Sequence, residues 1–214
     1  MVRTGSDGQL GALLAACRRA LAGDPHAAPF ATALSTIDPR ADGAPETGAA
    51  LPVLRWWGGS LTQPGRGALA EIACALEALR PALSFTQNPN YVAAPPSPAF
   101  LGRYGYAVLA GPASGPPALV EHPDLAFGVL LLGPETTYPI HVHPAAELYL
   151  PLGPACWSVD AGPLVERPAG TPIVHGSNQP HETRTGEVPL AALYVWLGEL
   201  ETAARILEPG FTRP

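Results

Sequence analysis

The sequence predicts a mainly β protein in which an α-helical N-terminal part packs on a β-barrel formed by the second half of the chain. Two patterns lead to this prediction. In the first half, apolar side chains recur at helical intervals. From residue 118 onward, short apolar runs alternate with Gly- and Pro-containing turns, as in a small all-β structure. We expect the helical part at 1–110 and the barrel at 111–214, joined as one integrated domain.

Three helices are expected in the N-terminal part, at residues 6–23, 24–38 and 66–79. Ser6 and Gln9 have the spacing of a capping box, and Asp24-Pro25 places an N-cap before a proline at the first helical position. The third helix carries leucine and isoleucine on one face. Segments 39–52 and 84–99 are rich in Pro with Gly or Asn, and we expect them to be loops.

The barrel strands are expected where short apolar or alternating runs lie between turns. Their ranges are 100–109, 118–121, 126–132, 139–143, 146–151, 155–160, 171–175 and 190–197. A last helix is expected at 199–208. Trp56 and Trp57 form the first aromatic cluster, which we expect at the seam between the helices and the barrel.

Composition excludes several classes of function. The net charge is −6 without a basic run, which argues against a nucleic-acid partner. All 12 basic residues are arginine, so the chain offers no lysine for Schiff-base chemistry. The three cysteines are widely spaced, which is typical of a reducing cytoplasm. We expect no signal peptide, and no apolar run approaches the ~18 residues of a membrane-spanning helix.

The stretch 138–149, Y-P-I-H-V-H-P-A-A-E-L-Y, carries the candidate chemistry. On a strand, His141 and His143 leave the same face because they are two residues apart. With Glu147 they offer the imidazole nitrogens and carboxylate oxygen that bind divalent metals. A further imidazole is expected from His175 or His181. Such a set accepts one divalent ion, and Zn, Fe(II), Mn, Co and Ni all remain open.

The pattern H-x-H-x-x-x-E, followed by P-A-G at 168–170 and a later histidine, resembles the two motifs of the cupin superfamily. The matching positions are His141, His143, Glu147 and His181. The resemblance implies a cupin-type β-barrel, or double-stranded β-helix, with the metal held inside it. His175 is then expected at a strand end or beside the ligands.

A narrower resemblance is to the cupin-type dimethylsulfoniopropionate (DMSP) lyases of the DddQ-like group. It is carried by Tyr138, His143, Glu147, Tyr149 and His181, together with A-L-Y-V-W-L-G-E at 192–199. The resemblance implies that His143, Glu147, Tyr149 and His181 hold the metal, with His141 either a further ligand or a substrate contact. It also implies that Tyr149 is the catalytic base and that Tyr138 assists at the substrate.

The implied reaction cleaves DMSP, a zwitterionic sulfonium carboxylate, to dimethyl sulfide and acrylate. This β-elimination needs a base and a means of stabilising enolate charge, which a metal supplies as a Lewis acid. A sulfonium is expected to lie against aromatic faces. The candidates for this contact are Trp196, Tyr138, Trp56 and Tyr104.

Two alternatives stay open on the sequence. One is another metal cupin, either an Fe(II) oxygenase or an isomerase of a small carboxylate, because one barrel fold hosts many chemistries. Tyr149 argues against an oxygenase, since a bound phenol would occupy a position that oxygen needs. The other is a non-catalytic ligand-binding cupin. The sequence leaves the oligomeric state open, and a homodimer is one of the assemblies compatible with it.

Overall fold

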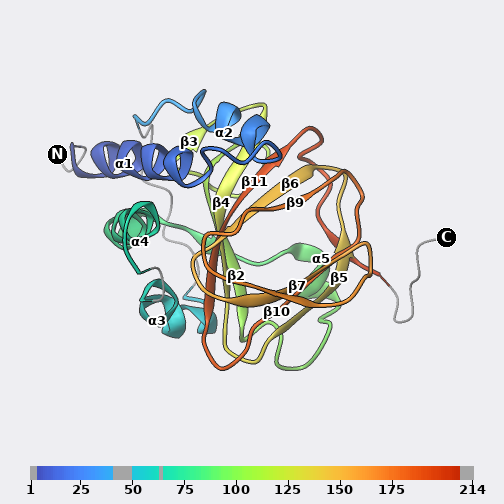
Figure 1. The fold of residues 1–214 in the computed structure, drawn as a ribbon. Coiled ribbons are helices and arrows are strands. Elements are labelled where there is room, and N and C mark those ends of the chain that lie inside the picture. The colour runs from blue at the N-terminus through green and yellow to red at the C-terminus, as the bar shows by residue number, and fades with distance from the viewer. Residues whose placement is uncertain (1–3, 41–49, 63–64, 208–214) are drawn as a thin grey trace.

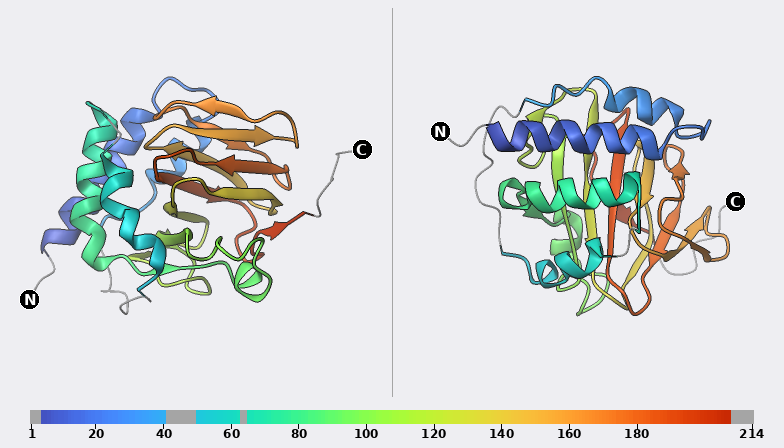
Figure 2. Two further views of the ribbon diagram at one scale, coloured as in Figure 1. Left: turned by 90° about the horizontal axis from the view of Figure 1, so that it is seen from below. Right: turned by 60° about the vertical axis from the view of Figure 1, so that its left-hand side comes forward.

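The computed structural model describes residues 4–40, 50–62 and 65–207, and it has two β-sheets with a layer of helices on one side (Figure 1). Figure 2 shows that this layer covers the outer face of one sheet, while the strands of the two sheets face each other. The helices are α1 Thr4–Ala20, α2 Ala28–Leu34, η1 Pro52–Trp56, α3 Trp57–Leu61, α4 Ala68–Leu79, η2 Arg80–Ala82 and α5 Pro89–Ala93.

The larger sheet has the order β1-β2-β4-β11-β6-β9, with β3 beside β2. Its strands are β1 Phe85–Thr86, β2 Tyr104–Gly111, β3 Val120–Glu121, β4 Leu125–Leu132, β6 Ala146–Pro151, β9 Ile173–His175 and β11 Leu190–Leu197. The central strands are apolar on both faces because both faces are covered. Phe127 and Leu193 pack against the helices, whereas Leu130 and Tyr194 face the interior.

The smaller sheet has the order β12-β5-β10-β7-β8. Its strands are β5 Thr137–Val142, β7 Ala155–Val159, β8 Val165–Arg167, β10 His181–Arg184 and β12 Arg205–Ile206. In the described part of the chain no strand pairing joins the two sheets, so the barrel is not closed. The arrangement confirms the predicted mainly β, cupin-type architecture with helices packed on it.

α1 and α4 follow the expected pattern, whereas the helix predicted at 24–38 is limited to α2, whose N-cap is Ala27 and not Asp24. α1 and α4 lie side by side across the outer face of the larger sheet (Figure 2). Leu13 of α1 and Leu76 of α4 are fully buried against that sheet. Of the predicted loop 39–52, residues 41–49 lie outside the described residues. No helix in the described ranges is long and apolar enough to cross a membrane.

Several segments differ from the expectations. β8 and β10 form where no strand was predicted, and η1 and α3 form where no helix was predicted. The predicted loop 84–99 contains β1 and α5, because the Asn88 side chain accepts a hydrogen bond from the Asn90 N–H and Pro89 starts the helix. The predicted last helix at 199–208 is wrong as far as residue 207, where the described chain ends. Gly198 turns the chain at φ 94°, and Arg205–Ile206 pairs with the free edge of β5 instead.

Candidate active site

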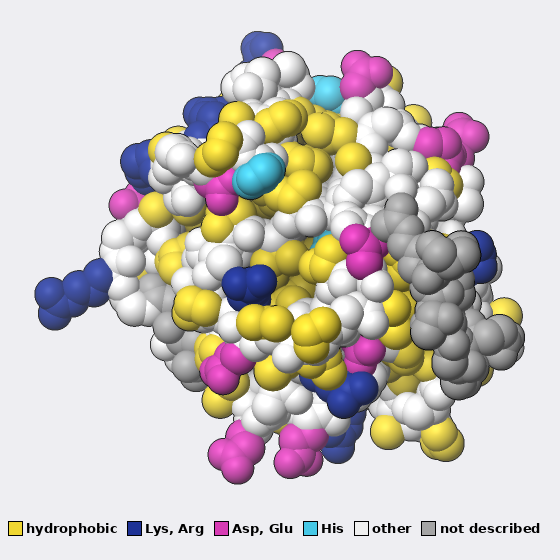
Figure 3. Space-filling view, turned by 45° about the vertical axis from the view of Figure 1, so that its right-hand side comes forward, with side chains coloured by type: hydrophobic (Ala, Val, Ile, Leu, Met, Phe, Trp, Pro, Cys, Tyr) yellow, Lys and Arg dark blue, Asp and Glu magenta, His cyan; other side chains and the backbone are white. Residues whose placement is uncertain are grey.

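A cavity of about 540 Å³ lies among the inward-facing side chains of the larger sheet and the C-terminal segment. Figure 3 shows one face of the molecule, on which hydrophobic side chains gather around a hollow. The lining includes Glu147 and, from β2, β5, β6 and β11, five tyrosines and a tryptophan: Tyr104, Tyr106, Tyr138, Tyr149, Tyr194 and Trp196. The charged side chains of the described lining are the carboxylates of Glu147 and Glu201, and none is an arginine. The cavity therefore offers a ligand aromatic faces and carboxylates.

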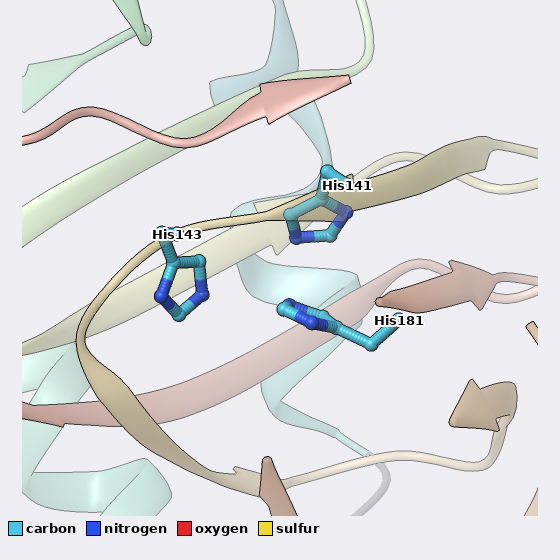
Figure 4. A group of neighbouring side chains, drawn as sticks. All are labelled: His141, His143 and His181. Atoms are coloured by element: carbon cyan, nitrogen blue, oxygen red, sulfur yellow. The ribbon is translucent and has the colours of Figure 1, made fainter. Parts of the chain in front are cut away.

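Three buried histidines meet beside this cavity. His141 is the next-to-last residue of β5, and His143 directly follows that strand. His181 is the first residue of β10 and pairs with His141. One ring nitrogen from each lies within 4.8 Å of the others. Figure 4 shows the three rings converging on one point.

Backbone carbonyls orient all three imidazoles. Each ring donates a hydrogen bond from Nδ1, which leaves Nε2 as the lone-pair nitrogen of the neutral ring. The acceptors are the carbonyl oxygens of Pro139, Ala145 and Gln179, at 2.8, 3.0 and 2.8 Å from the rings of His141, His143 and His181. Histidines that bind a metal through Nε2 are held in this way.

Glu147 completes the donor set. Its Oε2 lies 2.9 Å from Nε2 of His143 and 3.2 Å from Nε2 of His181, the latter outside hydrogen-bond geometry. Burial opposes ionisation of Glu147, but the imidazoles of His143 and His181 outweigh it and hold its pKa well below the usual range. Facing lone pairs repel, so this arrangement calls for a shared proton or cation.

The residues therefore fit a single metal ion. Nε2 of His141 and Nε2 of His181 are buried and have no hydrogen-bond partner among the described residues. Buried polar atoms of this kind are normally satisfied by protein, water or an ion. Three imidazole nitrogens with one carboxylate oxygen are an ordinary donor set for a divalent transition metal.

Two tyrosines border the donor set. Tyr149 follows Glu147 by two residues on β6 and lines the cavity from the same face. Burial raises its pKa well above the usual value, and the Glu147 carboxylate adds to this. The Tyr138 ring stacks on His141 at 3.9 Å and 6°, and burial likewise raises its pKa. In the metal-free chain both phenols therefore keep their protons.

A bulge brings Tyr138 and His141 to the same side. Their separation of three residues would place them on opposite faces of a regular strand. The pairing of β5 with β10 shifts between His181 and Thr183, so that three residues of β5 face two of β10. The strand rotates locally at such a shift. The sequence motif did not reveal this stacking.

Two further tyrosines line the cavity and were not among the sequence candidates: Tyr106 and Tyr194. Each lies two residues from a predicted contact, Tyr104 and Trp196, so strand alternation was the signal that could have found them. Tyr194 lies over Gly128, where an added Cβ would sit 2.5 Å from the Tyr194 hydroxyl oxygen. The absence of a side chain at Gly128 therefore leaves room for this ring.

Trp56 and His175 lie elsewhere than in the cavity lining. Trp56 is partly buried against the hydrophobic core, with the Arg55 guanidinium 3.9 Å from its ring centroid, and it is not among the described residues that line the cavity. His175 is fully buried and stacks on His181 at 4.0 Å and 12°. Burial lowers the pKa of His175 to about 3. His175 therefore lies beside the candidate ligands, which is one of the two positions expected from the sequence.

Comparisons with known proteins show which proteins this chain resembles. Residues 26–192 match the family model for dimethylsulfoniopropionate lyase. The curated dimethylsulfoniopropionate lyase DddQ of Ruegeria pomeroyi is 38% identical over 87 residues, which are 40% of this chain and 43% of that relative. The match thus spans less than half of the relative's length.

Solved structures match over almost the whole chain. The crystal structure of DMSP lyase DddQ from Ruegeria pomeroyi has a TM-score of 0.75 and 27% identity, and the match covers 96% of this chain and 99% of that one. A chain from the crystal structures of the DMSP lyases RdDddP and RnDddQII has a TM-score of 0.71 and 26% identity, with 94% and 98% covered.

Proposed function

Because the chain belongs to the dimethylsulfoniopropionate lyase family, we propose that it is a carbon–sulfur lyase that cleaves DMSP to dimethyl sulfide and acrylate in a metal-dependent reaction. The observation that carries this proposal is the placing of Tyr149 and Glu147 beside buried histidines at the wall of an aromatic cavity. A tyrosine that starts a β-elimination must lie both at the cavity that receives the substrate and close to the residues that hold the metal.

The cavity suits a small zwitterion. Its aromatic rings, Trp196 and Tyr104 among them, offer faces to a sulfonium cation. The only charged side chains in its described lining are Glu147 and Glu201. No arginine of the described lining therefore competes with the metal site for the substrate carboxylate. That carboxylate belongs at the histidine end, and the sulfonium belongs against the rings.

We assign the metal to His143, Glu147, His181 and Tyr149, with His141 as a further ligand. When bound, a divalent ion supplies Lewis-acid stabilisation of enolate charge and favours the phenolate form of a neighbouring tyrosine. The Nδ1–H bonds of the three imidazoles to backbone carbonyls fix their orientation beforehand.

Tyr149 acts as the base in this proposal. Its phenolate oxygen takes the proton from Cα of the substrate, and the C–H electron pair forms the Cα–Cβ double bond. The Cβ–S bond breaks and its electron pair leaves with sulfur, so the sulfonium departs as neutral dimethyl sulfide. No acid is needed for this leaving group. Tyr138, which lines the cavity beside His141, holds the substrate by a hydrogen bond from its hydroxyl.

Headspace measurement of dimethyl sulfide from purified protein and DMSP tests the proposal. Release that stops with a chelator and returns with added divalent metal is the expected result. Protein with one metal equivalent bound that releases no dimethyl sulfide above the no-enzyme rate would reject the lyase assignment. Activity that is unaffected after metal is removed to below a tenth of an equivalent would reject metal dependence alone.

A further inference from the structure

Tyr91 lies directly behind the cavity wall, in a segment whose sequence gave no functional signal. It sits on α5, it is 1% exposed, and it is absent from the cavity lining. Its hydroxyl oxygen lies 3.1 Å from the hydroxyl oxygen of Tyr138, which does line the cavity. The two residues are 47 positions apart in the chain.

The direction of this hydrogen bond decides what Tyr138 can do. Each phenol has a single proton to donate. If Tyr138 spends its proton on Tyr91, it can only accept from a ligand. If Tyr91 donates, the Tyr138 proton is free to point into the cavity. A carboxylate in the cavity is an acceptor only, so it favours the second arrangement.

We propose that Tyr91 is a positioning residue that donates its hydroxyl proton to the Tyr138 oxygen, so that Tyr138 directs its own proton at the substrate carboxylate. This inference rests on the proposed function. During elimination, negative charge grows on the carboxylate as enolate character develops, and a donor aimed at that charge stabilises it. A second phenol behind the first polarises it and strengthens the outer hydrogen bond.

The described part of the cavity lining has no cationic side chain that could stabilise negative charge on the substrate. The described lining contains no arginine, and the chain has no lysine. Apart from a bound metal, stabilisation of the growing charge must therefore come from neutral donors. The Tyr138 hydroxyl is one such donor, and stacking on the His141 ring, with centroids 3.9 Å apart, fixes its position.

Several contacts hold Tyr91 in place. Its ring makes edge contacts with Phe100, Tyr104 and Tyr138, with centroids 5.9, 5.7 and 5.7 Å away. The side-chain amides of Asn88 and Asn90 both donate to the carbonyl oxygen of Ala204, at 2.9 and 3.0 Å. α5 is thereby attached to the C-terminal segment that forms another wall of the cavity. Such anchoring keeps the Tyr91 hydroxyl at a fixed position.

The test is Tyr91→Phe, which keeps the ring and removes only the hydroxyl. We expect kcat for dimethyl sulfide release to fall about 10-fold, the size of one supporting hydrogen bond, while KM, metal content and Tm stay close to wild type. Val92→Ala, an exposed position on the same helix, serves as the control and should leave kcat unchanged.

A double-mutant cycle separates positioning from general packing. In a Tyr138→Phe background, Tyr91→Phe should have no further effect on kcat, because its hydroxyl acts through Tyr138. A full and additive loss in that background would overturn the inference, as would a wild-type kcat for Tyr91→Phe alone. If the wild-type protein releases dimethyl sulfide but the two variants behave in either of these ways, the inference alone fails. If the wild-type protein releases none, the proposed function fails and this inference fails with it.

Discussion

The indole Nε1 of Trp196 donates a hydrogen bond of 2.6 Å to Oε1 of Glu147. The other carboxylate oxygen faces His143 and His181. Trp196 therefore fixes which oxygen of Glu147 points at the histidines. Partners that orient a ligand in this way commonly alter metal affinity when they are removed.

Trp196→Phe is expected to weaken metal binding about 10- to 100-fold, because Glu147 loses the donor that orients it while an aromatic ring still stacks on His143. Competition with a chelator of known affinity measures this. Trp57→Phe is a matched control, since Trp57 of α3 donates an equivalent bond of 2.6 Å to Glu77 of α4, in the helix layer. Equal metal affinity in both variants would contradict the role given to Trp196.

His143→Ala is expected to abolish stoichiometric metal binding, because it removes one imidazole and leaves Oε2 of Glu147 without its nearest histidine. Metal analysis after gel filtration gives the occupancy. His26→Ala, at an exposed position, should retain the wild-type metal content. A full equivalent of metal in His143→Ala would show that the ion lies elsewhere.

Tyr149→Phe is expected to lower kcat at least about 100-fold, since removing a general base typically costs that much. Much of the bound metal should remain, because the imidazoles and Glu147 are intact. The measurement is dimethyl sulfide release normalised to metal content. Near-normal turnover in a metal-loaded variant would exclude Tyr149 as the base.

His175→Phe is expected to reduce the acid sensitivity of folding. The pKa of His175 is about 3 in the folded chain and about 6.5 when unfolded, so the unfolded state binds the extra proton between these values. The stability that comes from keeping the ring neutral is full above about pH 6.5 and is lost as the pH falls toward 3.

Urea unfolding with chelator at pH 7.5 and 5.5 measures this change. The wild type should lose about 1.4 kcal/mol more than His175→Phe over that interval, because the range includes one pH unit below 6.5. The difference between the two proteins removes the contribution of the other histidines. Parallel pH slopes for both proteins would mean that His175 is not held neutral by burial.

The local spacing of residues determined much of this protein. The two-residue period of a strand predicted that His141 and His143 share a face, and donor chemistry added Glu147. The family pattern then favoured His181 over His175 as the further imidazole. Helical intervals predicted α1 and α4, and short apolar runs predicted most strands. These features depend on neighbours within a few residues, so the sequence records them directly.

Tertiary structure decided the contacts between distant segments. The hydrogen bond between Tyr91 and Tyr138, the bond that Trp196 donates to Glu147 and the bulge that stacks Tyr138 on His141 all depend on strand register and packing. The tail formed a strand because the edge of β5 had unpaired backbone groups to satisfy. No local pattern encodes these partners, since each is selected by the whole fold burying its apolar faces and pairing its backbone at once.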